Sequence, residues 1–191
     1  MNTLMHICCA PCANRPIAQL REEGHSVTGF WFNPNIHPYT EYQARKATLE
    51  GYAKEIGMKL IIGGRYDLRS FITNVADNID GRCAYCYRVR MEETAKYAAE
   101  HGFDSFTTSL LISPYQKHDA IAAIAREMGQ QYGVEFLYRD FRPLFREGQE
   151  FAREHGFYMQ KYCGCIFSEE ERYMAAKWKK EAKRREQEAA A

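Results

Sequence analysis

The chain has 191 residues, of which 46% are hydrophobic and 27% are charged. This balance is typical of one folded globular domain and excludes a disordered chain. The 26 basic and 25 acidic residues nearly cancel, so net charge does not identify a nucleic-acid binder. No apolar run approaches the roughly 20 residues that span a bilayer, and the N-terminus lacks the basic region of a signal peptide. We therefore expect a cytoplasmic protein that does not bind a membrane.

Apolar residues recur along the chain with strand and helix spacings in alternation. Strands alternating with helices predict an α/β fold, here a single domain with a mainly parallel sheet and a C-terminal helix. In chain order we predict a strand at residues 3–8, a helix at 11–23, a strand at 26–32, a helix at 41–56, a strand at 58–62, a helix at 68–75, a helix at 87–100, a strand at 103–111, a helix at 118–132, a strand at 134–138, a helical region from residue 147 and a long helix from residue 169.

No internal repeat and no long linker divides the chain. We predict a catalytic α/β domain over residues 1–170 and a basic helical tail over residues 171–191. A charge run with acidic residues interleaved is usually a solvated helix face; attraction to RNA phosphates is the functional alternative. The basic side chains that crowd the C-terminal end of this tail are Lys177, Lys179, Lys180, Lys183, Arg184 and Arg185.

All seven cysteines fall into three clusters. A single buried cysteine is usually only a small hydrophobic residue, but in a reducing compartment clustered thiols indicate metal binding or redox catalysis. In open parallel sheets, ligands bind beyond the carboxyl ends of the strands, which is where the first cluster is predicted. The clusters are Cys8, Cys9 and Cys12; Cys83 and Cys86; and Cys163 and Cys165.

Four thiolates are the ligand set of a 4Fe-4S cluster. Cys8 and Cys9 follow the first strand, and Cys83 and Cys86 precede a helix whose N-terminal dipole favours thiolates. The simplest allocation therefore gives these four cysteines to the cluster. Arginines close in sequence add positive charge there: Arg82, Arg88 and Arg90.

Cys12, Cys163 and Cys165 remain, and the residues leave two roles open for them. In the first, all three cysteines hold a second metal ion, iron or zinc, beside the cluster. In the second, Cys163 and Cys165 form a strained redox-active disulfide across Gly164. The competing interpretation of all seven cysteines is structural zinc. The adjacent cysteine pair and the C-x-C spacing do not match the paired C-x-x-C spacing of zinc sites.

Five motifs, in order, resemble those of the cobalamin-independent epoxyqueuosine reductases. The resemblance extends over residues 1 to about 170 and is specific in several of the motifs. The motifs are HICCAPC at residues 6–12, NPNIHP at 33–38, RCAYC at 82–86, TTSLLISPY at 107–115 and YCGCIFS at 162–168.

That resemblance implies an oxidoreductase of queuosine biosynthesis. Epoxyqueuosine at the wobble position of the tRNAs for Tyr, His, Asp and Asn loses its epoxide oxygen, taking up two electrons and two protons and releasing water. The resemblance implies a 4Fe-4S cluster, no cobalamin and an electron donor that the sequence does not identify. The leftover thiols Cys12, Cys163 and Cys165 are then catalytic, since something has to hold the epoxide oxygen between single-electron transfers.

The resemblance also implies an adenine-nucleotide hydrolase-like, Rossmann-like fold, as in tRNA-modifying ATP pyrophosphatases. Those enzymes have a Ser-Gly-Gly-x-Asp-Ser loop after the first strand, whereas this chain has Cys8 to Cys12 there. We therefore expect no ATP. The alternatives are an iron–sulfur tRNA thiolase, which the missing loop disfavours, and a zinc-stabilised RNA-binding module.

Polar residues that follow other strands are candidates for the substrate pocket. They are predicted at the same sheet edge as the cysteines, and simple turn formation is the competing interpretation. The candidates are Asn33, Asn35, His37, Ser113 and Tyr115.

Overall fold

The computed structural model describes residues 1–189 and has an α/β architecture built on a five-stranded sheet. The strand order is β3-β2-β1-β4-β5 and every pairing is parallel. The predicted fold class is confirmed. The strands are β1 (Asn2–His6), β2 (Ser26–Trp31), β3 (Leu60–Ile62), β4 (Ser105–Thr108) and β5 (Glu135–Phe136).

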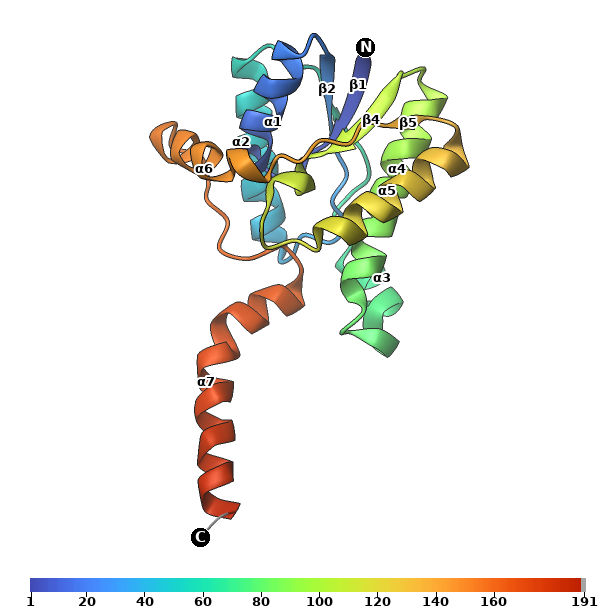
Figure 1. Cartoon of the computed structure of the whole chain (residues 1–191). Coiled ribbons are helices and arrows are strands. Elements are labelled where there is room, and N and C mark those ends of the chain that lie inside the picture. The colour runs from blue at the N-terminus through green and yellow to red at the C-terminus, as the bar shows by residue number, and fades with distance from the viewer. Residues whose placement is uncertain (190–191) are drawn as a thin grey trace.

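Helices cover both faces of the sheet (Figure 1). On one face α1 packs against α2 and α6, and on the other α4 packs against α5. α3 and α7 extend beyond the edge at which the strands end (Figure 1). The helices are α1 (Ala10–Glu22), α2 (Tyr39–Glu55), α3 (Leu68–Val75), α4 (Arg82–Glu100), α5 (His118–Tyr132), α6 (Phe145–Glu154) and α7 (Ile166–Ala189). None of the helices within residues 1–189 is long and apolar enough to cross a membrane.

Strand β1 lies at the centre of the sheet and forms the middle of the core. Leu4 and Met5 have no exposed surface, and neither do Phe30 of β2 and Phe106 of β4. A parallel strand covered on both faces is expected to be apolar throughout. Burying each such side chain contributes roughly 1.5–3 kcal/mol, so the sheet gives the site a rigid base.

The direction of sheet growth reverses between β1 and β4, because β2 and β3 lie on one side of β1 and β4 and β5 on the other. The carboxyl ends at such a switch point form the usual ligand crevice of this architecture. Cys8 follows β1 and Ser109 follows β4, and the Cys8 amide donates a hydrogen bond of 3.2 Å to the Ser109 hydroxyl. The first cysteine cluster therefore lies at the switch point.

Three predicted boundaries differ from the structure by three or more residues, and most of the others differ by one or two. Helix α4 begins at Arg82 and not at residue 87, because a turn in which the Gly81 amide donates to Asn78 Oδ1 leads directly into it. The fourth strand ends at Thr108, whose hydroxyl accepts a hydrogen bond from the Leu110 amide and starts a 3-10 turn, Ser109–Ile112. Helix α7 begins at Ile166, so it crosses the domain boundary predicted after residue 170. Residues 190–191 of the predicted tail lie outside the described residues.

Candidate active site

Three buried thiols form the centre of the site. The Sγ atoms of Cys8, Cys9 and Cys12 lie within 4.8 Å of one another. In a continuing strand, Cys8 and Cys9 would point to opposite faces. Here the strand ends at His6 and Cys9 is already the N-cap of α1, with Pro11 in its first turn. The start of the helix thus turns both thiols toward Cys12.

Of the three thiols, Cys8 loses its proton most readily. Hydrogen bonds from Cys12 and Cys9 hold the pKa of Cys8 well below its ordinary value. The hydrogen bond to Cys8 raises the pKa of Cys12 in return, and burial raises that of Cys9. A metal ion displaces the remaining protons when it binds such a group. Closely spaced thiols are the donors that soft metals and iron–sulfur clusters require, so the site fits an iron–sulfur cofactor.

The other four cysteines lie where α4 and α7 begin. Cys86 and Cys165 are buried in one small apolar cluster with Phe71 and Val75. Burial, with a smaller contribution from the nearby thiols, raises the pKa of the Cys86 thiol to about 12, although the positive charge of Arg90 opposes the rise. Cys163 is exposed and accepts a hydrogen bond of 3.0 Å from Gln116 Nε2. All seven cysteines are free thiols, and the disulfide between Cys163 and Cys165 stays a prediction.

Two buried arginines lie beside the thiols. Arg45 of α2 pairs with Glu41 at 2.6 Å and donates to the carbonyls of Tyr162 and Cys163, each at 3.0 Å. It therefore clamps the segment that contains Cys163. The sequence contained a signal for it, since Arg45 lies three and four residues from Tyr42 and Leu49, on the apolar face of its helix.

Arg90 of α4 is 2% exposed. It donates to the Cys86 carbonyl at 2.9 Å and to Cys86 Sγ at 3.0 Å. Within residues 1–189 it has no ion pair with a carboxylate. An unpaired buried charge costs several kcal/mol, and the negative charge favoured on the nearby Cys8 thiol, whose pKa is lowered, offsets part of that cost. Of the other two predicted arginines, Arg82 lies beside Cys165, whereas Arg88 points away and pairs with Glu127.

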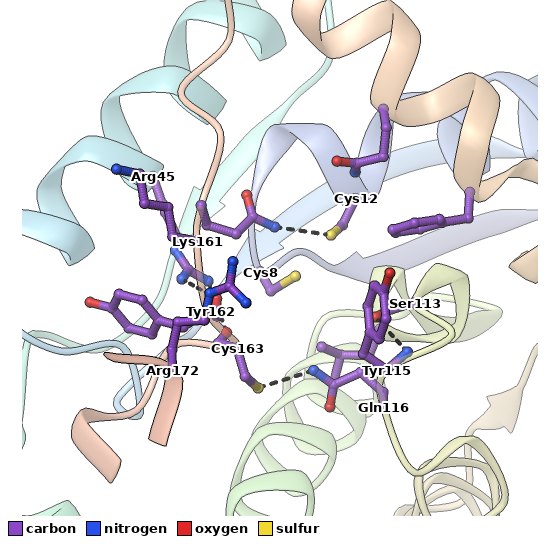
Figure 2. A pocket seen from close by; sticks show the side chains of 14 residues that line it. Cys8, Cys12, Arg45, Ser113, Tyr115, Gln116, Lys161, Tyr162, Cys163 and Arg172 are labelled. Atoms are coloured by element: carbon purple, nitrogen blue, oxygen red, sulfur yellow. Dashed lines mark hydrogen bonds between the residues drawn. The ribbon is translucent and has the colours of Figure 1, made fainter. Parts of the chain in front are cut away.

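A cavity of about 430 Å³ opens directly over the first cysteine cluster. In Figure 2, Ser113, Tyr115 and Gln116 approach it from one side, and Arg45, Lys161, Tyr162 and Arg172 from the other, with Cys8 between them. Thiols, amides, aromatic rings and cations thus meet in one space. Its lining includes Cys8, Cys12, Cys163, Gln116, Gln149, Gln160, Tyr115, Phe145, Tyr162, Arg45, Lys161, Arg172 and Ser113.

The predicted contact residues divide into two groups. Ser113 and Tyr115 line the cavity. Asn33, Asn35 and His37 are buried and are not part of its lining. Their contact with a substrate stays a prediction.

The loop that contains these three residues forms hydrogen bonds with the two segments that carry Cys8 and Cys163. Asn33 donates to the Ile7 carbonyl at 2.9 Å, and the His37 amide donates to the Gly164 carbonyl at 2.7 Å. Burial lowers the pKa of His37 to about 4, so its ring is neutral at physiological pH. Its Nε2 donates to the Pro34 carbonyl at 3.0 Å. The loop fixes both cysteine segments in place.

Sequence reasoning missed the amide side chains. Gln160 donates from Nε2 to Cys9 Sγ at 3.0 Å and to Cys12 Sγ at 3.4 Å. Gln116 binds Cys163, and Gln149 of α6 lines the same cavity. Nothing in the local pattern distinguishes these glutamines from surface ones, because only the fold brings residues 116, 149 and 160 together.

Together, the fold and the cavity define an α/β protein with a thiol-rich redox or metal centre at the switch point of its sheet. Residues 3–171 match the model of the family described as Epoxyqueuosine reductase QueH, and the chain belongs to that family of oxidoreductases. It is 39% identical over 170 residues to the epoxyqueuosine reductase QueH of Dehalococcoides mccartyi, covering 89% of this chain and 93% of that one. It is 34% identical over 174 residues to the QueH of Thermotoga maritima, covering 86% and 88%.

Two solved structures are similar in fold. The U34-tRNA thiolase NcsA from Methanococcus maripaludis with its [4Fe-4S] cluster has a TM-score of 0.52 and 14% identity, over 95% of this chain and 67% of that one. A predicted subunit of tRNA methyltransferase from Methanocaldococcus jannaschii has a TM-score of 0.51 and 13% identity, and the match covers 82% of this chain and 89% of that one. These similarities concern the architecture alone.

Proposed function

We propose that this protein reduces epoxyqueuosine to queuosine at the wobble position of tRNA, the last step of queuosine biosynthesis. The epoxide oxygen leaves as water after two electrons and two protons are taken up. The observation that supports this best is the cavity at the switch point, whose wall presents the thiols of Cys8, Cys12 and Cys163. It lies within the part of the chain, residues 3–171, that matches the reductase family.

We assign the 4Fe-4S cluster to Cys8, Cys9, Cys83 and Cys86. Of these, Cys9, Cys83 and Cys86 are not part of the cavity wall. This suits cluster ligands, which do not have to contact the substrate themselves. Arg90 supports a thiolate centre at this place, because its guanidinium is close enough to be stabilised by charge on Cys86, Cys163 and Cys8, which belong to both groups of cysteines. When bound, the cluster supplies electrons one at a time.

The remaining thiols complete the chemistry. Cys12 and Cys163 both face the cavity, and Cys165 is two residues from Cys163. They act either as ligands of a second iron or zinc ion, which stabilises the departing oxygen, or, for Cys163 and Cys165, as a dithiol that passes electrons inward. In both roles the thiol of Cys163 has to stay within reach of the substrate, which is what the clamp from Arg45 ensures.

The substrate reaches these thiols only as an extruded nucleotide, since a stacked base cannot enter a pocket. The cavity of about 430 Å³ is within the usual range of roughly 300–1,000 Å³ for small-ligand sites. Tyr115 is 84% exposed at its entrance, beside Phe145. We assign Tyr115 as a stacking platform for an unpaired anticodon base, and Ser113 as a polar contact inside.

Nucleoside analysis tests this function. Total tRNA from a strain that lacks the gene should accumulate epoxyqueuosine in the tRNAs for Tyr, His, Asp and Asn, and the wild-type gene should restore queuosine. Absence of epoxyqueuosine in the deletion strain refutes the assignment. Anaerobic purification tests the cofactor: about four or five irons per chain are expected, and a colourless zinc protein indicates the RNA-binding module instead. Thiolated tRNA lost on deletion indicates the thiolase.

A further inference from the structure

Helix α7 begins at the active site and then leaves the body of the protein. Its first two turns are anchored by the Arg82 guanidinium, which lies over the Phe167 ring and forms an ion pair of 2.5 Å with Glu171. Arg172 lines the cavity. From residue 175 to residue 188 every side chain is exposed, and Figure 1 shows the helix projecting past the carboxyl edge of the sheet.

The projecting part of α7 is positively charged. Residues 172–188 contain seven basic and three acidic side chains. At 3.6 residues per turn, Arg172, Lys179 and Lys183 fall within about 40° of arc on one face. Lys180 lies next to them. The row of basic side chains formed by Arg172, Lys179 and Lys183 extends for about 16 Å along the helix from the rim of the cavity.

Such a helix is not explained by the fold. A polar, free-standing helix gains little from packing and is marginal in water on its own. The match to the family model ends at residue 171, so the whole basic row from Arg172 onward lies outside the region that the model describes. A row of cations that starts at the rim of a nucleotide-binding cavity is complementary to the phosphates on either side of that nucleotide.

We propose that α7 is an RNA-backbone arm: Lys179, Lys180 and Lys183 contact phosphates of the anticodon stem while the wobble nucleotide occupies the cavity. This inference rests on the proposed function, because the cavity sets the position of the tRNA. Contacts of this kind recognise the shape and charge of the RNA backbone and do not distinguish one base sequence from another. A second copy of this chain is disfavoured as occupant, since two such helices side by side repel each other.

The test uses the cluster-loaded full chain and a triple variant, K179Q/K180Q/K183Q. The matched control is K54Q/K59Q/K96Q, which removes the same charge from exposed lysines at the opposite, amino-terminal edge of the sheet. Binding of an unmodified tRNA transcript is measured over a series of salt concentrations. Loss of three phosphate contacts should weaken binding at least tenfold at low salt and lower the slope of log Kd against log salt by roughly 2–3. The control should match the wild type.

Each other outcome overturns one specific statement. If the α7 variant binds tRNA as tightly and with the same salt slope as the wild type, the arm is refuted. If both triple variants weaken binding equally, the effect is one of net charge and the arm is again refuted. If W178A converts a dimer into a monomer and the lysine variants change nothing, α7 is an interface between copies. Turnover of epoxyqueuosine-containing tRNA by the wild type is measured in parallel, and its absence refutes the proposed function independently of the arm.

Discussion

The guanidinium of Arg90 donates a hydrogen bond of 3.0 Å to Cys86 Sγ from a position with almost no solvent exposure. Hydrogen bonds to cluster sulfurs and the net charge around them are the main controls that a protein has over an iron–sulfur potential. A buried cation stabilises the reduced, more negative form. Arg90 therefore acts through Cys86 and raises the reduction potential of the proposed cluster, which makes the cluster easier to reduce.

Arg90→Gln should lower the reduction potential of the loaded protein. A charge-assisted hydrogen bond contributes roughly 1.5–3 kcal/mol. For a one-electron couple, a difference of about 1.4 kcal/mol corresponds to about 59 mV, so we expect a negative shift on the order of 60 mV or more. Potentiometric titration followed by electron paramagnetic resonance measures it directly.

Arg88→Gln is the matched control for that experiment. Arg88 is on the same helix and has the same charge, but it is exposed and pairs with Glu127 at 2.8 Å. Its removal should leave the potential within experimental error. Equal shifts in the two variants indicate a general charge effect and remove the special role of the contact with Cys86.

The assignment of thiols predicts two different phenotypes. Cys83→Ala removes a proposed cluster ligand, so iron content and the visible spectrum should be lost together with activity. Cys163→Ala should retain most of the iron, because Cys163 is exposed at the cavity, and should nevertheless abolish turnover. Iron analysis of the two anaerobically purified variants decides the matter. The reverse pattern overturns the partition, and retention of activity by Cys163→Ala removes that thiol from the chemistry.

The fold was predictable because its signals are local. The apolar run before Cys8 and the β-branched, aromatic run of residues 26–32 are strands in the structure, shortened by one or two residues. Helix α3 has its predicted bounds, Leu68–Val75. Where the prediction failed, a turn decided the outcome: Thr108 ends β4 by accepting a hydrogen bond from the Leu110 amide, which an apolar pattern does not reveal.

The site was predictable only where the residue type itself indicates a particular chemistry, as cysteine does. Thiols are rare enough for their clustering to be informative, and the structure places Cys8, Cys9 and Cys12 together. Gln160 approaches two of these thiols from 148 and 151 residues away. Such a contact depends on tertiary structure alone. Arg90 has helical spacing relative to Cys86, but spacing does not say whether an arginine is buried.

Gly164 allows the backbone between Cys163 and Cys165 to adopt its conformation. Its φ is +149°, and an added Cβ would lie 3.4 Å from both Arg45 Nη1 and Ile36 Cγ1. Gly164→Ala should cost roughly 1–3 kcal/mol of local strain, displace Cys163 and reduce turnover at least tenfold. Circular dichroism should show an unchanged fold. Gly51→Ala is the control, since Gly51 is in helix α2 with open space around it, and alanine there favours the helix. If turnover is normal in Gly164→Ala, the position of Cys163 is not critical.

Tyr115 gives the sharpest test of how the nucleotide is held. Its ring is 84% exposed and lies 5.8 Å from the Phe145 ring in an edge-on arrangement, so one face is free to stack. Base–aromatic stacking contributes roughly 1–3 kcal/mol per base, which corresponds to a rise in KM for tRNA of about five- to 150-fold in Tyr115→Ala. The kcat at saturating tRNA should change little, because we assign the chemistry to the thiols and only nucleotide binding to this ring. Tyr115→Phe keeps the stacking surface and should retain the wild-type KM. A Phe variant as impaired as the Ala variant assigns the role to the hydroxyl group, and an unchanged KM in Tyr115→Ala excludes the residue from tRNA binding.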